Sequence, residues 1–178
     1  SYRNIQKAII NSIESPEILL DFFKSGYIDL FDIKSIERFA DNEDILTPVA
    51  LNHRLESHRK KAVTLIESEE TLKYIALNDE SFDVQSMALL EYNSQYRQSK
   101  GKYRFNPTFR FIDEDVFYKY LMNNKDNNSN FFESIVKESI NHIKNPSYLM
   151  DMALNSVNPA MFYSAVNSNY FDRNLIDE

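Results

Sequence analysis

The chain has 178 residues, 43% of them hydrophobic, and a net charge of −7, a composition ordinary for one domain with a buried core. It has no cysteine and only two glycines, which excludes disulfides, thiolate metal sites and the glycine-rich loops that bind phosphates or dinucleotides. No apolar run approaches the roughly 20 residues of a membrane helix, and the first residues lack the pattern of a signal peptide, so we expect a cytoplasmic protein.

The first predicted helix begins after Ser15 and ends at Gly26. Serine is a residue type that caps a helix N-terminus with its side-chain oxygen, and Pro16 follows at the first helical position, where a missing N–H costs no bond. Glycine ends helices because it adopts the left-handed conformation. A second helix is expected to follow, with Phe31 and the small Ser35 on the side that packs against the first.

Two further helix pairs repeat this pattern at intervals of 27 and 26 residues, with caps at Asn42 and Ser68. Asn52 and Asn78 are predicted to end the first helix of each pair, since Asn tolerates the left-handed conformation. The second helices carry a small residue at a fixed position, which allows close helix packing. The small residues in these two pairs are Ala62 and Ala88, and the positions predicted to be buried are Leu72, Ile75, Ala76, Val84 and Ala88.

An insertion of about 18 residues, near 94–111, interrupts the repeat. The stretch from Tyr92 to Ile112 has no acidic residue, but it has five cations interleaved with aromatic residues. Such a composition binds phosphates and stacks bases, and it is equally typical of protein interface hot spots. Alternatively, the segment folds onto the acidic surface of its own protein. The residues predicted to contact a partner here are Arg97, Lys102, Tyr103, Arg104 and Arg110.

Two more pairs are predicted after the insertion, with caps at Asp113 and Asn145 and helix ends at Asn123 and Asn155. The start of a sixth first helix is expected at Asp172. The sequence therefore predicts one all-α domain over residues 1–178, or a piece excised from a longer array of the same repeats.

The run Ile75-Ala76-Leu77-Asn78-Asp79, followed by Phe82-Asp83-Val84-Gln85 and Ala88, resembles the short HEAT-like repeats of bacterial α-solenoids. In that pattern an Arg commonly stands where this chain has Gln85. The resemblance implies a right-handed α-α superhelix of about five HEAT-like helix pairs. It implies little about function, because such repeats occur in scaffolds, in regulators and in a group of DNA glycosylases.

The sequence offers no constellation of catalytic residues, so we predict that the protein is not an enzyme and has no cofactor or metal. His53 and His58 are five residues apart, about 140° around a helix, and His142 stands alone. The carboxylates gather at helix starts, where the helix dipole favours them.

A second basic patch opens the second helix of the second pair. It is expected to face a groove or to be a solvated helix face, and it is formed by Arg54, His58, Arg59, Lys60 and Lys61. Arg59 and Lys60 are predicted partner-binding residues.

We therefore expect a non-enzymatic scaffold for protein–protein interaction, with a protein partner, no membrane and an oligomeric state that the sequence does not specify. The alternative is a nucleic-acid-binding or DNA-repair HEAT-like protein related to the alkylpurine DNA glycosylases. The net charge of −7 disfavours this alternative, because nucleic acid attracts basic proteins.

Overall fold

A computed structural model describes residues 1–93 and 113–172. In these ranges the protein consists of helices and connecting turns, with no strand, which confirms the all-α prediction. None of the helices described is both long enough and apolar enough to cross a bilayer. The chain forms two compact units, unit 1 (Ser1–Tyr92) and unit 2 (Asn93–Glu178). The single repeat domain expected over 1–178 stays a prediction.

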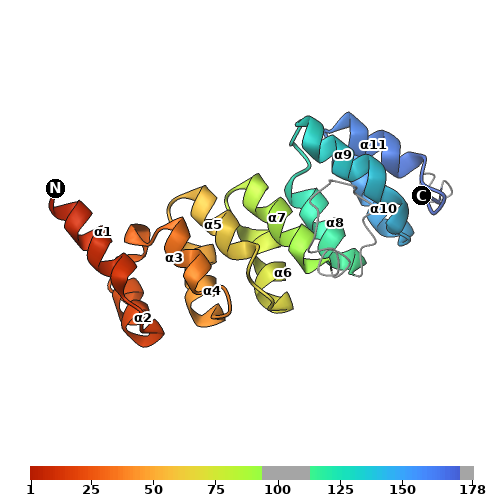
Figure 1. The fold of residues 1–178 in the computed structure, drawn as a ribbon. Coiled ribbons are helices and arrows are strands. Elements are labelled where there is room, and N and C mark those ends of the chain that lie inside the picture. The colour runs from red at the N-terminus through yellow and green to blue at the C-terminus, as the bar shows by residue number, and fades with distance from the viewer. Residues whose placement is uncertain (94–112, 173–178) are drawn as a thin grey trace. The chain divides into compact units, whose positions relative to one another are not determined.

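Unit 1 holds seven α-helices and one short 3-10 helix (Figure 1). The first helices of its three pairs contact one another in order, and so do the second helices. The first helices are α2 (Pro16–Lys24), α4 (Glu43–Asn52) and α6 (Glu69–Asn78); the second helices are α3 (Ile33–Arg38), α5 (Glu56–Val63) and α7 (Phe82–Tyr92); the 3-10 helix η1 (Ile28–Leu30) precedes α3.

Helix α1 (Tyr2–Ser12) lies before the first pair and was not among the predicted elements. The side chain of Asn11 joins it to that pair: its Nδ2 donates to the Leu30 carbonyl at 3.2 Å, and its Oδ1 accepts from the Asp32 N–H at 3.0 Å. The helix expected to begin at Asp172 falls on 173–178, outside the described residues.

Unit 2 contains four α-helices and one short 3-10 helix, counted over residues 113–172. Its two predicted pairs are both present, and α11 contacts both α9 and α10. The elements are α8 (Glu114–Asn123), α9 (Asn130–Ser139), the 3-10 helix η3 (Ile140–His142), α10 (Pro146–Asn155) and α11 (Pro159–Val166).

The predicted N-terminal caps are confirmed in all five pairs. Each cap side chain accepts a hydrogen bond from a backbone N–H in the first turn of its helix, which satisfies a donor that the helix leaves without a partner. The caps are Ser15, Asn42, Ser68, Asp113 and Asn145.

The reason given for asparagine at the helix ends is wrong. Gly26 has the predicted positive φ of 85°, but no other described residue has a positive φ. Instead, the asparagine amide donates back to the carbonyl one turn earlier. The Nδ2 of Asn52 bonds the Pro48 oxygen at 3.2 Å, and that of Asn78 bonds the Tyr74 oxygen at 2.8 Å. In these two helices the asparagine side chain therefore adds a hydrogen bond to the last turn, while its backbone keeps a negative φ.

The predicted core positions are confirmed. Leu72, Ala76, Val84 and Ala88 are fully buried, and Ile75 is 1% exposed. The small residues at the fixed position of the second helices are buried too, as close helix packing requires; they are Ser35, Ala62, Ala88 and Ala165.

Acidic residues at helix starts also connect successive pairs. The Glu43 carboxylate accepts hydrogen bonds from the backbone N–H groups of Glu67 and Ser68, the latter at 2.7 Å. In unit 2, Glu114 does the same for Lys144 and Asn145, at 2.8 and 2.6 Å. The first-turn carboxylates therefore do more than offset the helix dipole, because two of them bond the backbone just before the next first helix.

Two tyrosines join α8 to α10 in unit 2. The rings of Tyr118 and Tyr148 stack with centroids 4.0 Å apart and nearly parallel planes. Each hydroxyl donates to a carboxylate on the other helix, Tyr118 to Asp151 and Tyr148 to Asp115. Burial, followed by the hydrogen bond to Asp151, raises the pKa of Tyr118 to about 12. The phenol therefore stays protonated and keeps donating at neutral pH.

Candidate functional site

The basic and aromatic residues predicted to contact a partner in the insertion lie outside the described residues. These are Arg97, Lys102, Tyr103, Arg104 and Arg110, and their role stays a prediction. The other two predicted contact residues, Arg59 and Lys60, lie on α5 in unit 1.

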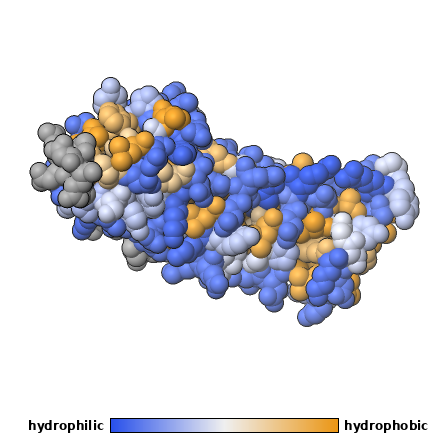
Figure 2. All heavy atoms as spheres, turned by 180° about the vertical axis from the view of Figure 1, so that it is seen from behind, coloured by the Kyte–Doolittle hydropathy of each residue, from blue (hydrophilic) through white to orange (hydrophobic). Residues whose placement is uncertain are grey.

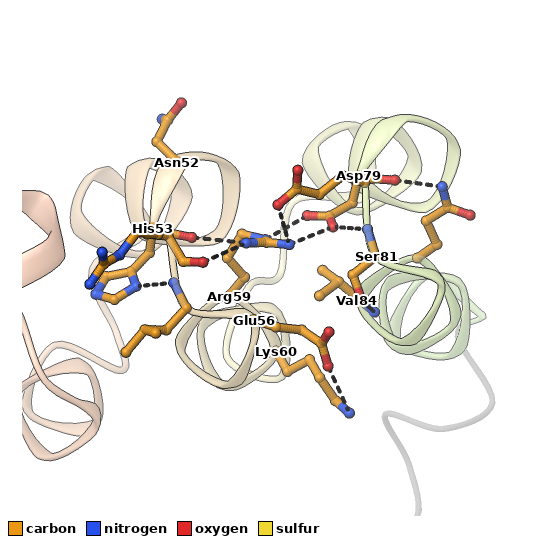
Figure 3. Close-up of polar contacts among 12 residues, drawn as sticks. Asn52, His53, Glu56, Arg59, Lys60, Asp79, Ser81 and Val84 are labelled. Carbon is orange, nitrogen blue, oxygen red and sulfur yellow. Dashed lines mark hydrogen bonds and ion pairs between the residues drawn. The ribbon is translucent and has the colours of Figure 1, made fainter.

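Arg59 is buried, with 4% of its surface exposed. Its Nε and Nη2 atoms donate to the two carboxylate oxygens of Asp79 at 2.9 and 3.0 Å, and Nη1 donates to the His53 carbonyl at 3.0 Å. Figure 3 shows the guanidinium lying between the end of α4 and the end of α6. This position does not suit the predicted contact with a partner, because the guanidinium donates its hydrogen bonds to groups inside unit 1.

Asp79 is equally committed to this junction. Its side chain is 6% exposed; its Oδ1 also accepts from the Ser81 N–H at 2.7 Å, and its carbonyl accepts from the Gln85 amide at 2.6 Å. The Arg59–Asp79 pair therefore fixes the second helix pair against the turn of the third. Bidentate arginine–carboxylate pairs of this kind are both strong and geometrically specific.

The remaining cations of the predicted basic patch are balanced by carboxylates. Lys60 Nζ lies 3.0 Å from Asp83, and Lys61 Nζ lies 2.7 Å from Glu37. Arg54 lies 3.8 Å from Asp29. The patch is thus a set of ion pairs between neighbouring helix pairs, and it presents little net positive charge to a partner.

The two histidines expected to point apart are in contact. His53 caps the end of α4 while His58 lies in α5, and their rings stack with centroids 4.2 Å apart. His53 is 1% exposed; its Nδ1 accepts from the Leu55 N–H at 3.1 Å, so Nε2 carries the proton and donates to the Phe31 carbonyl at 3.1 Å. The prediction treated both residues as parts of one helix, and that premise was wrong.

His53 should make the stability of the protein depend on pH. Burial, and next the charge of neighbouring His58, lower its pKa from the ordinary 6.5. As the pH falls, the unfolded chain therefore takes up a proton on His53 before the folded protein does. The free energy of unfolding keeps this contribution above about pH 6.5 and loses it as the pH drops toward the lowered pKa of the folded state. Urea unfolding at pH 7.5 and 5.5 should show this loss. His53→Gln, which keeps an N–H donor, should show less of it, and an unchanged pH dependence in that variant would contradict the assignment.

No group of three or more His, Asp or Glu side chains is arranged to hold a metal ion within residues 1–93 and 113–172. The carboxylates at the helix starts act as caps, as first-turn charges or as acceptors for the next helix pair, as Asp113, Glu69 and Glu43 respectively illustrate.

A surface groove lies between α4 and α6, and the sequence analysis missed it. Two adjoining hollows share Leu51 and Tyr74 as walls. These two side chains are exposed, at 39% and 57%. One hollow extends to Thr47, Glu70 and Thr71, and the other to Asn52, Ile75, Asn78 and Asp79.

Apolar groups are visible elsewhere on the surface as well. Figure 2 shows hydrophobic residues in separate patches within a largely hydrophilic face. The groove between α4 and α6 is concave and has an apolar wall on each of two helices, whereas another hollow, lined by Ile5, Ala8 and Ile9, lies along the single helix α1. Concavity with a few polar groups is the usual form of a binding site.

Comparison with known proteins finds no family model, no curated protein and no solved structure that matches the chain.

Proposed function

We propose that the protein is a non-enzymatic scaffold that binds a protein partner in the cytoplasm, built as a right-handed superhelix of HEAT-like helix pairs. The observation that carries the proposal is the groove between α4 and α6, which exposes Leu51 and Tyr74 on two adjacent first helices. Repeats that contact only their neighbours expose a long surface of this kind and use it to bind extended partners.

The packing of unit 1 supports the HEAT-like architecture. First helices contact first helices, and second helices contact second helices. Arg59 lies one repeat, 26 residues, before Gln85, which is the position where HEAT-like repeats commonly carry an arginine. Its pairing with Asp79 of the following pair gives that arginine a structural purpose.

The internal use of the charged residues also supports a scaffold. The buried guanidinium of Arg59 and the ring of His53 are fully engaged in joining helix pairs. Ionisable groups with shifted pKa values at an active site are usually directed into a cleft, whereas these are directed between helices.

Affinity capture with the tagged full chain, from the organism that encodes it, tests the proposal. We expect a protein to be recovered that re-forms a complex with the purified chain on size-exclusion chromatography. Replacing residues 94–111 by a short polar linker examines the other predicted contact site in the same assay. The nucleic-acid alternative would take over if the chain instead bound DNA with an affinity that fell steeply with salt.

A further inference from the structure

The walls and the ends of the groove between α4 and α6 differ in chemistry. Leu51 projects from the last turn of α4, and Tyr74 projects from the middle of α6. Glu70 lies one helical turn before Tyr74, lines the same hollow and is exposed. The groove therefore combines an aliphatic surface, an accessible aromatic ring and a carboxylate within reach of one another.

The two helices that form the groove are acidic. Together they carry four carboxylates, Glu43, Asp44, Glu69 and Glu70, and one cation, Lys73. Two of the nearby carboxylates already accept hydrogen bonds within the protein, Glu43 from backbone N–H groups and Asp79 from Arg59. Glu70 lines the groove and is exposed, so it is the carboxylate left available to a ligand there; Asp44 and Glu69 are exposed elsewhere on the same two helices.

This arrangement suits a cationic group with an apolar stem. A guanidinium over the face of a tyrosine ring is attracted by the ring quadrupole, and a carboxylate beside the ring adds an ion pair. The methylene groups of arginine pack along apolar surface while the charged head stays hydrated. Phosphate-bearing ligands would meet repulsion from Glu70 and from the acidic helices around it.

We propose that this groove binds a basic segment of a partner protein, with an arginine of that segment over Tyr74, its guanidinium paired with Glu70, and an apolar neighbour against Leu51. The inference rests on the proposed scaffold function and specifies its surface and the chemistry of its partner. It differs from the predicted contacts of residues 94–111, because every residue it uses lies on α4 or α6.

The test uses fluorescein-labelled 12-residue peptides that alternate Arg with Leu, and a twin with Glu in place of Arg, titrated with the full chain. Fluorescence anisotropy should show that the Arg peptide binds and that added salt weakens its binding. The Glu peptide should not bind. Tyr74→Ala and Glu70→Gln should each weaken the binding of the Arg peptide by about 3- to 10-fold, the range expected for one exposed cation–π contact or ion pair.

Matched substitutions separate this site from general attraction to an acidic protein. Tyr163→Ala removes a tyrosine that is 63% exposed on α11, and Glu138→Gln removes an exposed carboxylate from α9. Both controls should bind the Arg peptide within about twofold of the parent. Equal effects of the groove variants and their controls would overturn the proposal, provided that all four variants melt near the parent.

Two further outcomes distinguish this inference from the scaffold function itself. If the Tyr74→Ala variant still bound a captured partner at full affinity, the groove would not be the binding site, but the proposed scaffold function would remain supported. Selective peptide binding without any captured protein would support the groove and count against the scaffold. If labelled single-stranded DNA bound and Tyr74→Ala abolished that binding, nucleic acid would replace a basic protein as the occupant.

Discussion

Arg59→Met is expected to lower the free energy of unfolding by about 3–5 kcal/mol, the usual cost of removing one partner of a buried ion pair. The Asp79 carboxylate would remain only 6% exposed, without its bidentate partner. Methionine retains the apolar part of the side chain, so the loss of stability measures the removal of the guanidinium charge more than a change in side-chain volume. Chemical unfolding followed by circular dichroism measures the effect.

Two variants make the interpretation specific. Adding Asp79→Asn to Arg59→Met removes the unpaired charge and keeps an oxygen for the Ser81 N–H, so the double variant should be more stable than the single one. Lys60→Met breaks an ion pair with Asp83 whose side chains are 32% and 54% exposed, so it should cost at most about 1 kcal/mol. A loss below about 1 kcal/mol for Arg59→Met would contradict a structural role for the pair.

Ala88→Glu should have the larger effect and leave unit 1 without its native fold. Ala88 is fully buried on α7 at the position where small residues allow helices to approach. A glutamate there would bring an unpaired charge and extra volume into a packed interface, and losses above about 4 kcal/mol are typical of such changes. Thermal unfolding by circular dichroism would show a lost or strongly lowered transition.

The same substitution at an exposed alanine provides the control. Ala8 lies on the exposed side of α1, so Ala8→Glu should change the free energy of unfolding by no more than about 0.5 kcal/mol. An Ala88→Glu protein that melted within a few degrees of the parent would show that the assigned packing face is wrong.

The parts of the fold that the sequence predicted are those with local causes. A cap such as Ser68 or Asn145 bonds a backbone N–H two or three residues away, and a small residue such as Ala62 recurs at a fixed place in each pair. Both signals are contained within one helix or one repeat. Asparagine at a helix end was also recognised, although the left-handed backbone predicted for it is absent and its side chain bonds the preceding turn instead.

The junctions between helix pairs were harder to predict because their partners are about one repeat apart. Nothing near Arg59 marks Asp79 as its partner 20 residues later, and Arg59 therefore resembled a surface cation. A signal was present, because Arg59 occupies the register of Gln85 in the preceding repeat, where an arginine is common in HEAT-like sequences. The contact of His53 with His58 was missed for a different reason: the helix was correctly predicted to end at Asn52, yet the two histidines were still compared as if they lay on one helix.

The groove between α4 and α6 was not predicted because its walls look like core residues. Leu51 follows Val49 and Ala50, both fully buried, in a short apolar run whose members differ only in the face they occupy. Tyr74 lies directly before the buried Ile75. Helical spacing separates the buried face from the exposed one within a helix, but it does not show which exposed residues of two different helices lie beside each other.

The contacts of Glu43 and Glu114 with the backbone have a consequence for how such a chain can evolve. Each carboxylate bonds main-chain N–H groups of the next pair rather than any side chain. Because every residue except proline offers an N–H, the neighbour can change its sequence without losing these bonds. Duplication or exchange of a helix pair would therefore preserve the linkage, so the array can diverge in sequence while its joints stay the same.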